Sequence, residues 1–129
     1  MEDNYKHSEI TDLVIKAFYK VYNKLGYGFL ERVYLNALVL ELLTLELVVK
    51  KEQPIIVFYN GMEVGKYIAD LIVNDCIIVE LKATEILKEE HEAQLTNYLR
   101  ATEIDVGLLL NFGKKPQIKR KVFTSIKNE

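Results

Sequence analysis

Two charged side chains end an otherwise apolar segment, Cys76-Ile-Ile-Val-Glu-Leu-Lys82. Such a segment is typical of a buried strand, and the two-residue period of a strand sends Glu80 and Lys82 to one face, about 6.5 Å apart. Burying either charge alone would cost several kcal/mol, so each needs a partner or an ion. Asp70 is placed similarly in the preceding apolar segment, residues 67–73. One acid on each of two strands, with a lysine beside the second acid, is the arrangement of a metal-dependent phosphodiesterase.

The chemistry of these residues suits a divalent cation. Hydrolysis of a phosphodiester needs a dication that offsets developing charge and lowers the pKa of a water molecule. Hard oxygen ligands favour Mg²⁺, with Mn²⁺ as an alternative. We expect Asp70 and Glu80 to supply carboxylates, the Leu81 carbonyl to add an oxygen, and Lys82 to hold or deprotonate the attacking water. Two carboxylates about 5 Å apart repel by about 3 kcal/mol at an effective dielectric constant near 20, which favours a cation between them.

The register of the two strands provides an independent check on this site. A two-residue turn at Asn74-Asp75 would send Asp70 and Glu80 to opposite faces of the sheet. A three-residue loop, 74–76, would place Asp70 directly across from Glu80, with Cβ atoms about 4.5–5.5 Å apart. The metal site therefore predicts an odd loop or a bulge. The alternative is that Glu80 and Lys82 form only an ion pair at the end of a strand.

The elements that must position these residues follow from the apolar pattern. Ser8 is a candidate N-cap for a first helix, and Asn60-Gly61 is typical of a two-residue hairpin turn. The apolar run that begins at Val106 is too continuous for a strand with one face in water. A helix before that strand allows a parallel crossover, so the sequence predicts an α/β fold with a mixed central sheet flanked by helices. In chain order we expect helices over 8–24 and 29–43, strands over 48–59, 62–73 and 76–83, a helix over 88–102, a strand over 106–111, a loop over 113–116, and a final strand or helix–strand mixture over 118–126.

Composition limits the classes of function. The chain has 129 residues, enough for one domain with a real core. Its formal net charge of −2 excludes a polycation that grips nucleic acid everywhere, so any such contact must come from a local patch. A single cysteine excludes an internal disulfide and a cysteine-based zinc site. The N-terminal residues lack a secretory pattern and we see no membrane span, so a cytoplasmic location is the simplest expectation.

Other residues join the candidate site less directly. Gln94 and Tyr98 lie one helical turn apart, so both can reach the same site. Glu31 and Tyr34 form a similar pair, although spacing alone also fits Glu31 as a solvated acid near a helix start. A basic group near the C-terminus could follow a nucleic-acid backbone, and a solvated tail explains it equally well. That group is Lys114, Lys115, Lys119, Arg120 and Lys121.

At these residues the chain resembles a known group of proteins. Asp70, Glu80-Leu-Lys82 and Gln94-Leu-Thr-Asn-Tyr98 are similar to the PD-(D/E)xK nuclease superfamily, especially its RecB-type exonuclease branch. Gly28-Phe-Leu-Glu31-Arg-Val-Tyr34 resembles the signature of the GxxExxY protein family. Glu52-Gln-Pro54 and Leu108-Leu-Leu-Asn-Phe-Gly113 also match that family's pattern. The resemblance covers about residues 9–124. The chain departs from the superfamily name in having Ala69, instead of proline, before the aspartate.

The resemblance implies a restriction-endonuclease-like core over a single domain, residues 1–129, and a Mg²⁺ site built from Asp70, Glu80 and Lys82. By the superfamily's pattern, Gln94 orients the lysine or the substrate and Tyr98 contacts the nucleic-acid backbone. Glu31 is an additional acid associated with the metal. The further expected nucleic-acid contacts are Tyr34, Lys114 and Lys115.

The resulting hypothesis is a Mg²⁺-dependent nuclease that hydrolyses DNA by attack of a metal-activated water. A nucleic-acid-binding or assembly module that keeps the fold without turnover is the alternative. A metal-dependent enzyme acting on a small phosphoester is a third. Homodimerisation is compatible with each, because one small domain offers little surface to hold a duplex.

Overall fold

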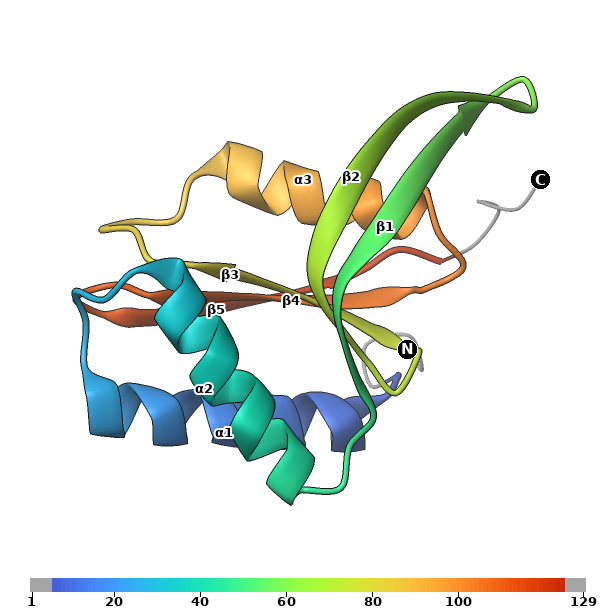
Figure 1. Cartoon of the computed structure of the whole chain (residues 1–129). Coiled ribbons are helices and arrows are strands. Elements are labelled where there is room, and N and C mark those ends of the chain that lie inside the picture. The colour runs from blue at the N-terminus through green and yellow to red at the C-terminus, as the bar shows by residue number, and fades with distance from the viewer. Residues whose placement is uncertain (1–5, 125–129) are drawn as a thin grey trace.

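The computed structural model describes residues 6–124. Two helices are followed by three strands, a third helix and two more strands (Figure 1). This order matches the predicted one, with most boundaries shifted by only one or two residues. The elements are α1 (Ser8–Leu25), α2 (Glu31–Thr44), β1 (Val49–Tyr59), β2 (Met62–Val73), β3 (Ile77–Lys82), α3 (Glu89–Arg100), β4 (Val106–Phe112) and β5 (Pro116–Val122).

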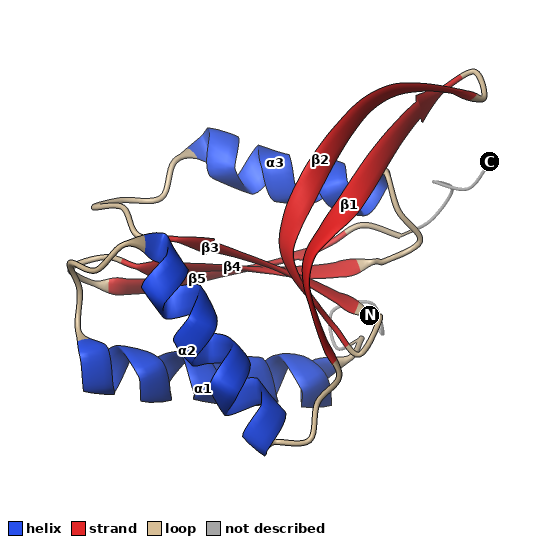
Figure 2. Cartoon of the chain, in the orientation of Figure 1, coloured by secondary structure: helices blue, strands red, loops and turns tan. Residues whose placement is uncertain are grey.

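The five strands form one mixed sheet in the order β1-β2-β3-β4-β5. β3 and β4 are parallel, and the other neighbouring strands are antiparallel. The parallel pair is joined by α3, because a connection between parallel strands must cross back over the sheet. Helices α1 and α2 cover one face of the sheet and α3 covers the other (Figure 2). The predicted α/β class is confirmed, and the arrangement is consistent with a restriction-endonuclease-like core.

Two apolar cores follow from this layering. The larger core joins Phe18, Leu38 and their neighbours on α1 and α2 to side chains from β2, β3 and β4. The smaller core packs Leu95 and Leu99 of α3 against the opposite face of the sheet. Gly107 on β4 permits this close approach, because a Cβ atom there would lie 2.7 Å from Leu95 Cδ1. The side-chain alternation of β3 therefore divides its residues between two buried faces.

Two local predictions need correction. His7, and not Ser8, is the N-cap of α1, with a left-handed φ of 57° and no side-chain cap hydrogen bond. Ser8 is already helical, and its carbonyl accepts a hydrogen bond from the Thr11 hydroxyl at 3.1 Å. The last segment is a strand that begins at Pro116, inside the predicted loop. The predicted end of that segment, residues 125–126, lies outside the described residues.

The β1–β2 hairpin extends beyond the rest of the sheet (Figure 1). β2 pairs with β3 over only three residue pairs, from Val73↔Ile77 to Leu71↔Val79. β1 and β2 continue to pair with each other as far as Tyr59↔Met62. We call residues 53–69 the hairpin arm. Its tip is the predicted Asn60-Gly61 turn, where both residues have positive φ, 51° and 78°. The arm thus projects from the sheet close to Asp70.

None of the helices in residues 6–124 combines the length and the apolarity that crossing a bilayer requires.

Candidate active site

The reversal between β2 and β3 sets the position of both acids. Val73 pairs with Ile77, so three residues, 74–76, lie outside the ladder. Asn74 and Asp75 both adopt left-handed backbone conformations, and Cys76 N donates to Val73 O at 3.0 Å. Continuing the same register places Asp70 across from Glu80. The odd loop predicted from the metal-site hypothesis is confirmed.

Asp70 and Glu80 hold each other's strands at the point where β2 and β3 separate. Asp70 N donates to Glu80 Oε2 at 2.7 Å, and Leu81 N donates to Asp70 Oδ2 at 2.8 Å. Main-chain pairing of the two strands ends one residue earlier, at Leu71↔Val79. Each carboxylate therefore bonds the opposite strand where the regular ladder stops. This reciprocal arrangement brings the two acids together and restricts their rotation.

Burial shifts the titration of both acids in the same direction. Glu80 is only 5% exposed, and desolvation, followed by repulsion from Asp70, raises its pKa to about 8. Desolvation also raises the pKa of Asp70, although the Leu81 amide and the Lys82 ammonium act in the opposite direction. Without a cation, the Glu80 carboxyl therefore holds its proton at neutral pH. A dication between the acids would remove the cause of the shift.

The remaining carboxylate oxygens fit a hard cation. One oxygen of Asp70 and one of Glu80 accept the backbone hydrogen bonds, and neither carboxyl group makes another side-chain hydrogen bond in the described chain. Within residues 6–124, no fully buried side-chain oxygen lacks a hydrogen-bond partner, so each second oxygen retains some access to solvent. Two neighbouring carboxyl groups with partly accessible oxygens offer the hard ligands that Mg²⁺ or Mn²⁺ prefers.

Glu31 lies near this pair without joining it. Glu31 is the first residue of α2 and lines a pocket of about 250 Å³ together with Asp70 and Leu81. Its charge contributes to the raised pKa of Glu80. Nevertheless, the described part of the chain contains no group of three or more His, Cys, Asp or Glu side chains arranged to hold a metal ion. Glu31 thus lies on the side of the pocket that α2 contributes.

Lys82 ends β3, beside Asn111 of β4. Its charge lowers the pKa of both Asp70 and Glu80, which places the ammonium within electrostatic reach of the acids. No ion pair within 4.0 Å joins Lys82 to either acid among residues 6–124. The alternative interpretation, a simple Glu80–Lys82 ion pair, therefore has no support in the structure.

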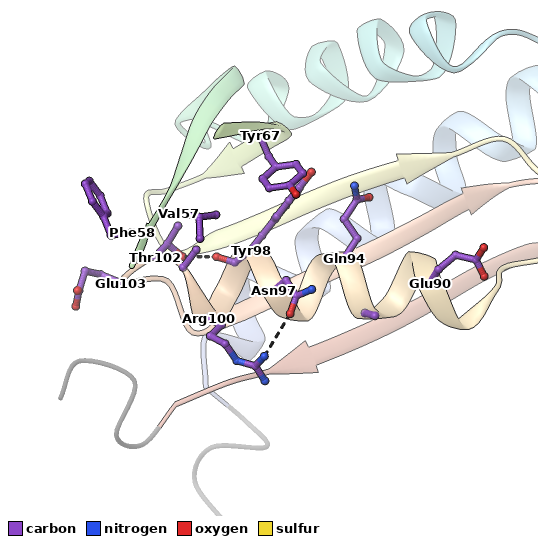
Figure 3. Close-up of a pocket in the computed structure, with 12 residues that line it drawn as sticks. Val57, Phe58, Tyr67, Glu90, Gln94, Asn97, Tyr98, Arg100, Thr102 and Glu103 are labelled. Atoms are coloured by element: carbon purple, nitrogen blue, oxygen red, sulfur yellow. Dashed lines mark hydrogen bonds between the residues drawn. The ribbon is translucent and has the colours of Figure 1, made fainter. Parts of the chain in front are cut away.

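Gln94 and Tyr98 approach from the α3 side of the sheet (Figure 3). Tyr98 is 5% exposed, and its ring lies 5.7 Å from the Tyr67 ring of β2. Desolvation, Glu80 and Asp70 raise the pKa of Tyr98 to about 12, so its hydroxyl stays protonated next to the acids. Gln94 is half-buried, and it lines a groove beside α3 together with Tyr67 and Tyr98. The structure thus places Tyr98 within electrostatic reach of the acid pair and Gln94 one helical turn away in the same pocket.

Tyr34 has a different role from the expected one. Its side chain is fully buried and stacks on Phe112, with the ring centroids 4.3 Å apart. Its hydroxyl donates to Gly26 O at 2.7 Å and accepts from Phe29 N at 3.1 Å. Tyr34 therefore holds the α1–α2 loop, and the expected contact with nucleic acid is corrected to a structural role.

Lys114 and Lys115 are exposed in the turn between β4 and β5. Lys114 lines a pocket with Gly28 and Phe29 of the α1–α2 loop. That pocket does not include Asp70 or Glu80. The two lysines remain candidate nucleic-acid contacts at a distance from the acids.

The sequence analysis did not identify the hydrogen-bond network of Asn111, which lies beside Lys82 on the neighbouring strand. Asn111 is fully buried; it accepts from Thr84 N at 2.9 Å and donates to Thr84 O at 2.9 Å and to Gln117 Oε1 at 3.0 Å. This network fixes the start of the loop that follows Lys82. The signal in the sequence was an amide at the end of an otherwise apolar strand.

Glu52 on β1 belongs to the Glu52-Gln-Pro54 motif, but that motif did not indicate its place in the structure. Glu52 lies beside the Asp70 level of β2, between the pairs Lys51↔Leu71 and Gln53↔Ala69, and has a φ of 54°. Its carboxylate pairs with Arg32 at 3.0 Å, and both residues line the pocket that contains Asp70. A left-handed glutamate within a strand costs on the order of 1 kcal/mol, and no sequence pattern indicated it.

Together, the mixed sheet and the acid pair define a class: an α/β protein in which two carboxylates each bond the opposite strand at the point where two central strands diverge. Comparison with models of protein families assigns the chain to a family. Residues 8–121 match the model of the PD-(D/E)XK nuclease superfamily, and the chain belongs to that superfamily. Its members are usually nucleases and typically use divalent metals. The search of curated proteins and the search of solved structures each returned no match.

Proposed function

We propose that this protein is a Mg²⁺-dependent nuclease that hydrolyses phosphodiester bonds of DNA. The observation that carries the proposal is the reciprocal hydrogen bonding of Asp70 and Glu80, which holds a half-buried and a buried carboxyl group side by side with one oxygen of each left available. Membership of the nuclease superfamily supports the same chemistry. Resemblance to the GxxExxY family and to the RecB-type branch remains a prediction.

Each residue has a distinct role in the proposed reaction. Asp70 and Glu80 would hold the ion, and the Leu81 carbonyl and Glu31, which lines a pocket with Asp70, would be additional oxygen donors. Bound Mg²⁺ supplies positive charge against the phosphate and lowers the pKa of water. The Lys82 ammonium positions the attacking water and offsets the charge that develops on the phosphate. Gln94 orients Lys82 or the substrate, and the protonated Tyr98 hydroxyl can donate a hydrogen bond to the substrate backbone.

A cleavage assay tests this function. The protein is incubated with labelled single- and double-stranded DNA and RNA in Mg²⁺, in Mn²⁺ and in a chelator. We expect cleavage of DNA only with a divalent ion. Asp70→Asn and Lys82→Ala should each lower the rate by about 100-fold or more, because each removes a group that acts on the reacting phosphate or water.

Matched controls separate loss of chemistry from loss of folding. Asp75→Asn alters an exposed acid in the turn between β2 and β3, and it breaks only the ion pair of Asp75 with Lys50. Lys16→Ala alters an exposed lysine on α1. Both controls should cleave at the parent rate. Equal residual cleavage in Asp70→Asn, Lys82→Ala and the parent would indicate a contaminating nuclease and would refute the proposal.

A binding or assembly module without turnover is the second candidate. The observation that favours it is the absence, within residues 6–124, of a ready group of three metal-binding side chains, together with the separation of Lys82 from both acids. It predicts nucleic-acid binding that survives chelation and does not change in Lys82→Ala. The cleavage assay and a binding measurement on the same variant distinguish the two candidates.

A further inference from the structure

A groove of about 690 Å³ lies between the hairpin arm and α3. Phe58 and Tyr67 line it from the arm, and Gln94, Asn97 and Tyr98 line it from the helix (Figure 3). The groove exists because β2 leaves β3 at Asp70 and continues only as a two-stranded ribbon. A volume of this size accommodates a small ligand or part of a polymer.

Tyr98 and Tyr67 relate one end of the groove to the acid pair, although neither Asp70 nor Glu80 lines it. Tyr98 lies in the groove wall, and the charges of Glu80 and Asp70 both contribute to its raised pKa. Tyr67 precedes Asp70 by three residues on β2 and packs against Tyr98 at a ring distance of 5.7 Å and an angle of 45°. A strand of nucleic acid that passes the acid pair can therefore extend into the groove at its Tyr67–Tyr98 end.

The groove offers aromatic faces and amide groups. Tyr67 is 50% exposed and Phe58 is 62% exposed, so both rings retain uncovered surface. Gln94 and Asn97 each present a hydrogen-bond donor and an acceptor. Planar bases with polar edges match such a surface, because every base has a face that stacks on an aromatic ring.

The charges in the groove do not suit a phosphate backbone. Glu90 and Glu103 line it together with one cation, Arg100. Arg100 is already engaged, since it donates to Asn97 Oδ1 at 3.3 Å and lies 4.8 Å from the Phe123 ring. A groove with two carboxylates and one arginine that is already engaged attracts uncharged nucleobases better than negatively charged phosphates. The phosphates would instead pass the acid pair and Lys82.

We propose that this groove binds unpaired bases adjacent to the scissile phosphate, which makes single-stranded nucleic acid, or a single-stranded tail on a duplex, the substrate class. This inference rests on the proposed nuclease function. A blunt duplex is a poor ligand, because its base faces are stacked and its edges are paired. Tyr67 and Phe58 are then specificity-determining residues contributed by the arm.

Binding without cleavage tests the inference directly. The chain contains no tryptophan, so Phe58→Trp introduces a single fluorescent reporter into the groove. Tyr59→Trp is the matched control, because Tyr59 is 69% exposed on the arm and does not line the groove. Without divalent ions, we expect a single-stranded oligonucleotide to quench the indole fluorescence of the Phe58→Trp variant. A blunt duplex and an oligonucleotide of abasic sites should leave that fluorescence unchanged, as should all three ligands in the control variant.

Affinity measurements identify the ring that carries the contact. Tyr67→Leu should weaken single-strand binding by about 5- to 150-fold, corresponding to about 1–3 kcal/mol of base stacking. Tyr67→Phe keeps the ring and should bind as the parent does. Tyr59→Leu, which alters an exposed ring outside the groove, should also leave the affinity unchanged. Because these side chains are exposed, circular dichroism should show the parent fold in all three variants.

The outcomes separate this inference from the proposed function. Ring-dependent single-strand binding without cleavage of any substrate would refute the nuclease and support the groove. Metal-dependent cleavage of blunt duplex at the single-strand rate would support the nuclease and overturn the groove inference. Equal single-strand affinity in Tyr67→Leu and Tyr59→Leu would also overturn it. A dimer abolished by Phe58→Ala, with single-strand binding unchanged, would assign the groove to a second copy of the chain.

Discussion

Glu80 is the most deeply buried ionisable residue of the candidate site that lies on the sheet, and its titration makes the stability of the folded chain depend on pH. Its pKa is raised from 4.5 to about 8 by desolvation and by the neighbouring Asp70. Between these two pH values the folded chain holds a proton that the unfolded chain has released. The contribution of Glu80 to the free energy of unfolding must therefore fall as pH rises through this window, and Asp70, whose pKa is also raised, contributes with the same sign.

The first prediction concerns Glu80→Gln in the absence of divalent ions. The parent should lose stability between pH 4.5 and pH 8, and the variant should show a shallower loss, because glutamine keeps an acceptor for Asp70 N and cannot ionise. The difference in slope is at most about 1.4 kcal/mol per pH unit. Urea unfolding at several pH values measures it. Glu63→Gln, an exposed acid on the arm, is the control, and equal slopes for parent and Glu80→Gln would contradict the prediction.

The second prediction concerns proton release on metal binding. At neutral pH the Glu80 carboxyl is protonated, so Mg²⁺ must displace about one proton when it binds. Calorimetric titration in buffers of different ionisation heat counts that proton. The release should disappear well above pH 8, where the carboxyl is already ionised, and Glu80→Gln should lose both the proton and most of the binding heat. Binding heat that does not depend on the buffer at neutral pH would argue against the predicted role of Glu80.

At the scale of elements, close contacts between neighbouring segments hold the site in place. The β4–β5 turn and the loop after β3 approach so closely that a Cβ atom on Gly113 would lie 2.1 Å from Thr84 O. The same loop is held by the hydrogen bonds of Asn111 to Thr84. Lys82 is two residues before Thr84, so these contacts hold the backbone that directly follows Lys82.

The third prediction is that Gly113→Ala destabilises the protein by about 1–3 kcal/mol, because the loop must move away from the added methyl group. Cleavage should fall as well, since the movement displaces Lys82. Thermal unfolding and the cleavage rate measure the two effects. Gly65→Ala is the matched control, because the nearest atoms to its added Cβ lie at an ordinary 3.9 Å. A Gly113→Ala protein as stable as Gly65→Ala would refute the predicted contact.

At the scale of the whole molecule, the formal net charge of −2 limits how the chain can hold a polyanion. The candidate phosphate contacts are few: Lys82 at the end of β3, and Lys114 and Lys115 in the β4–β5 turn. Affinity must therefore come partly from uncharged contacts, as in the groove beside the arm.

The fourth prediction follows from this charge distribution. With about three phosphate contacts, the logarithm of the single-strand association constant should fall with the logarithm of salt concentration at a slope of about −2. Fluorescence anisotropy between about 50 mM and about 200 mM salt measures it. Lys114→Ala should make the slope shallower by about 0.7, and Tyr67→Leu should lower the affinity without changing the slope. A slope several times steeper would indicate a phosphate-tracking surface elsewhere.

The extent of successful sequence prediction differs between residues. Period-two and helical patterns predicted the order of the elements, and the isolated acids in apolar strands predicted the Asp70–Glu80 pair. Tyr34 was assigned wrongly, because an aromatic residue one turn from Glu31 looks the same in sequence whether it packs on Phe112 or faces a ligand. The place of Glu52 in the structure was not predicted, since its left-handed backbone and its pairing with Arg32 depend on elements far apart in the chain.

The sequence by itself determined that two carboxylates in buried strands require a partner, because local pattern fixes burial and burial fixes the electrostatic cost. Only the tertiary structure decided which atoms meet that requirement. The divergence of β2 from β3 aims each carboxylate at the backbone of the opposite strand and opens the groove beneath the arm. Such contacts depend on register and on the path of strands after they separate, which are properties of paired segments and not of either segment alone.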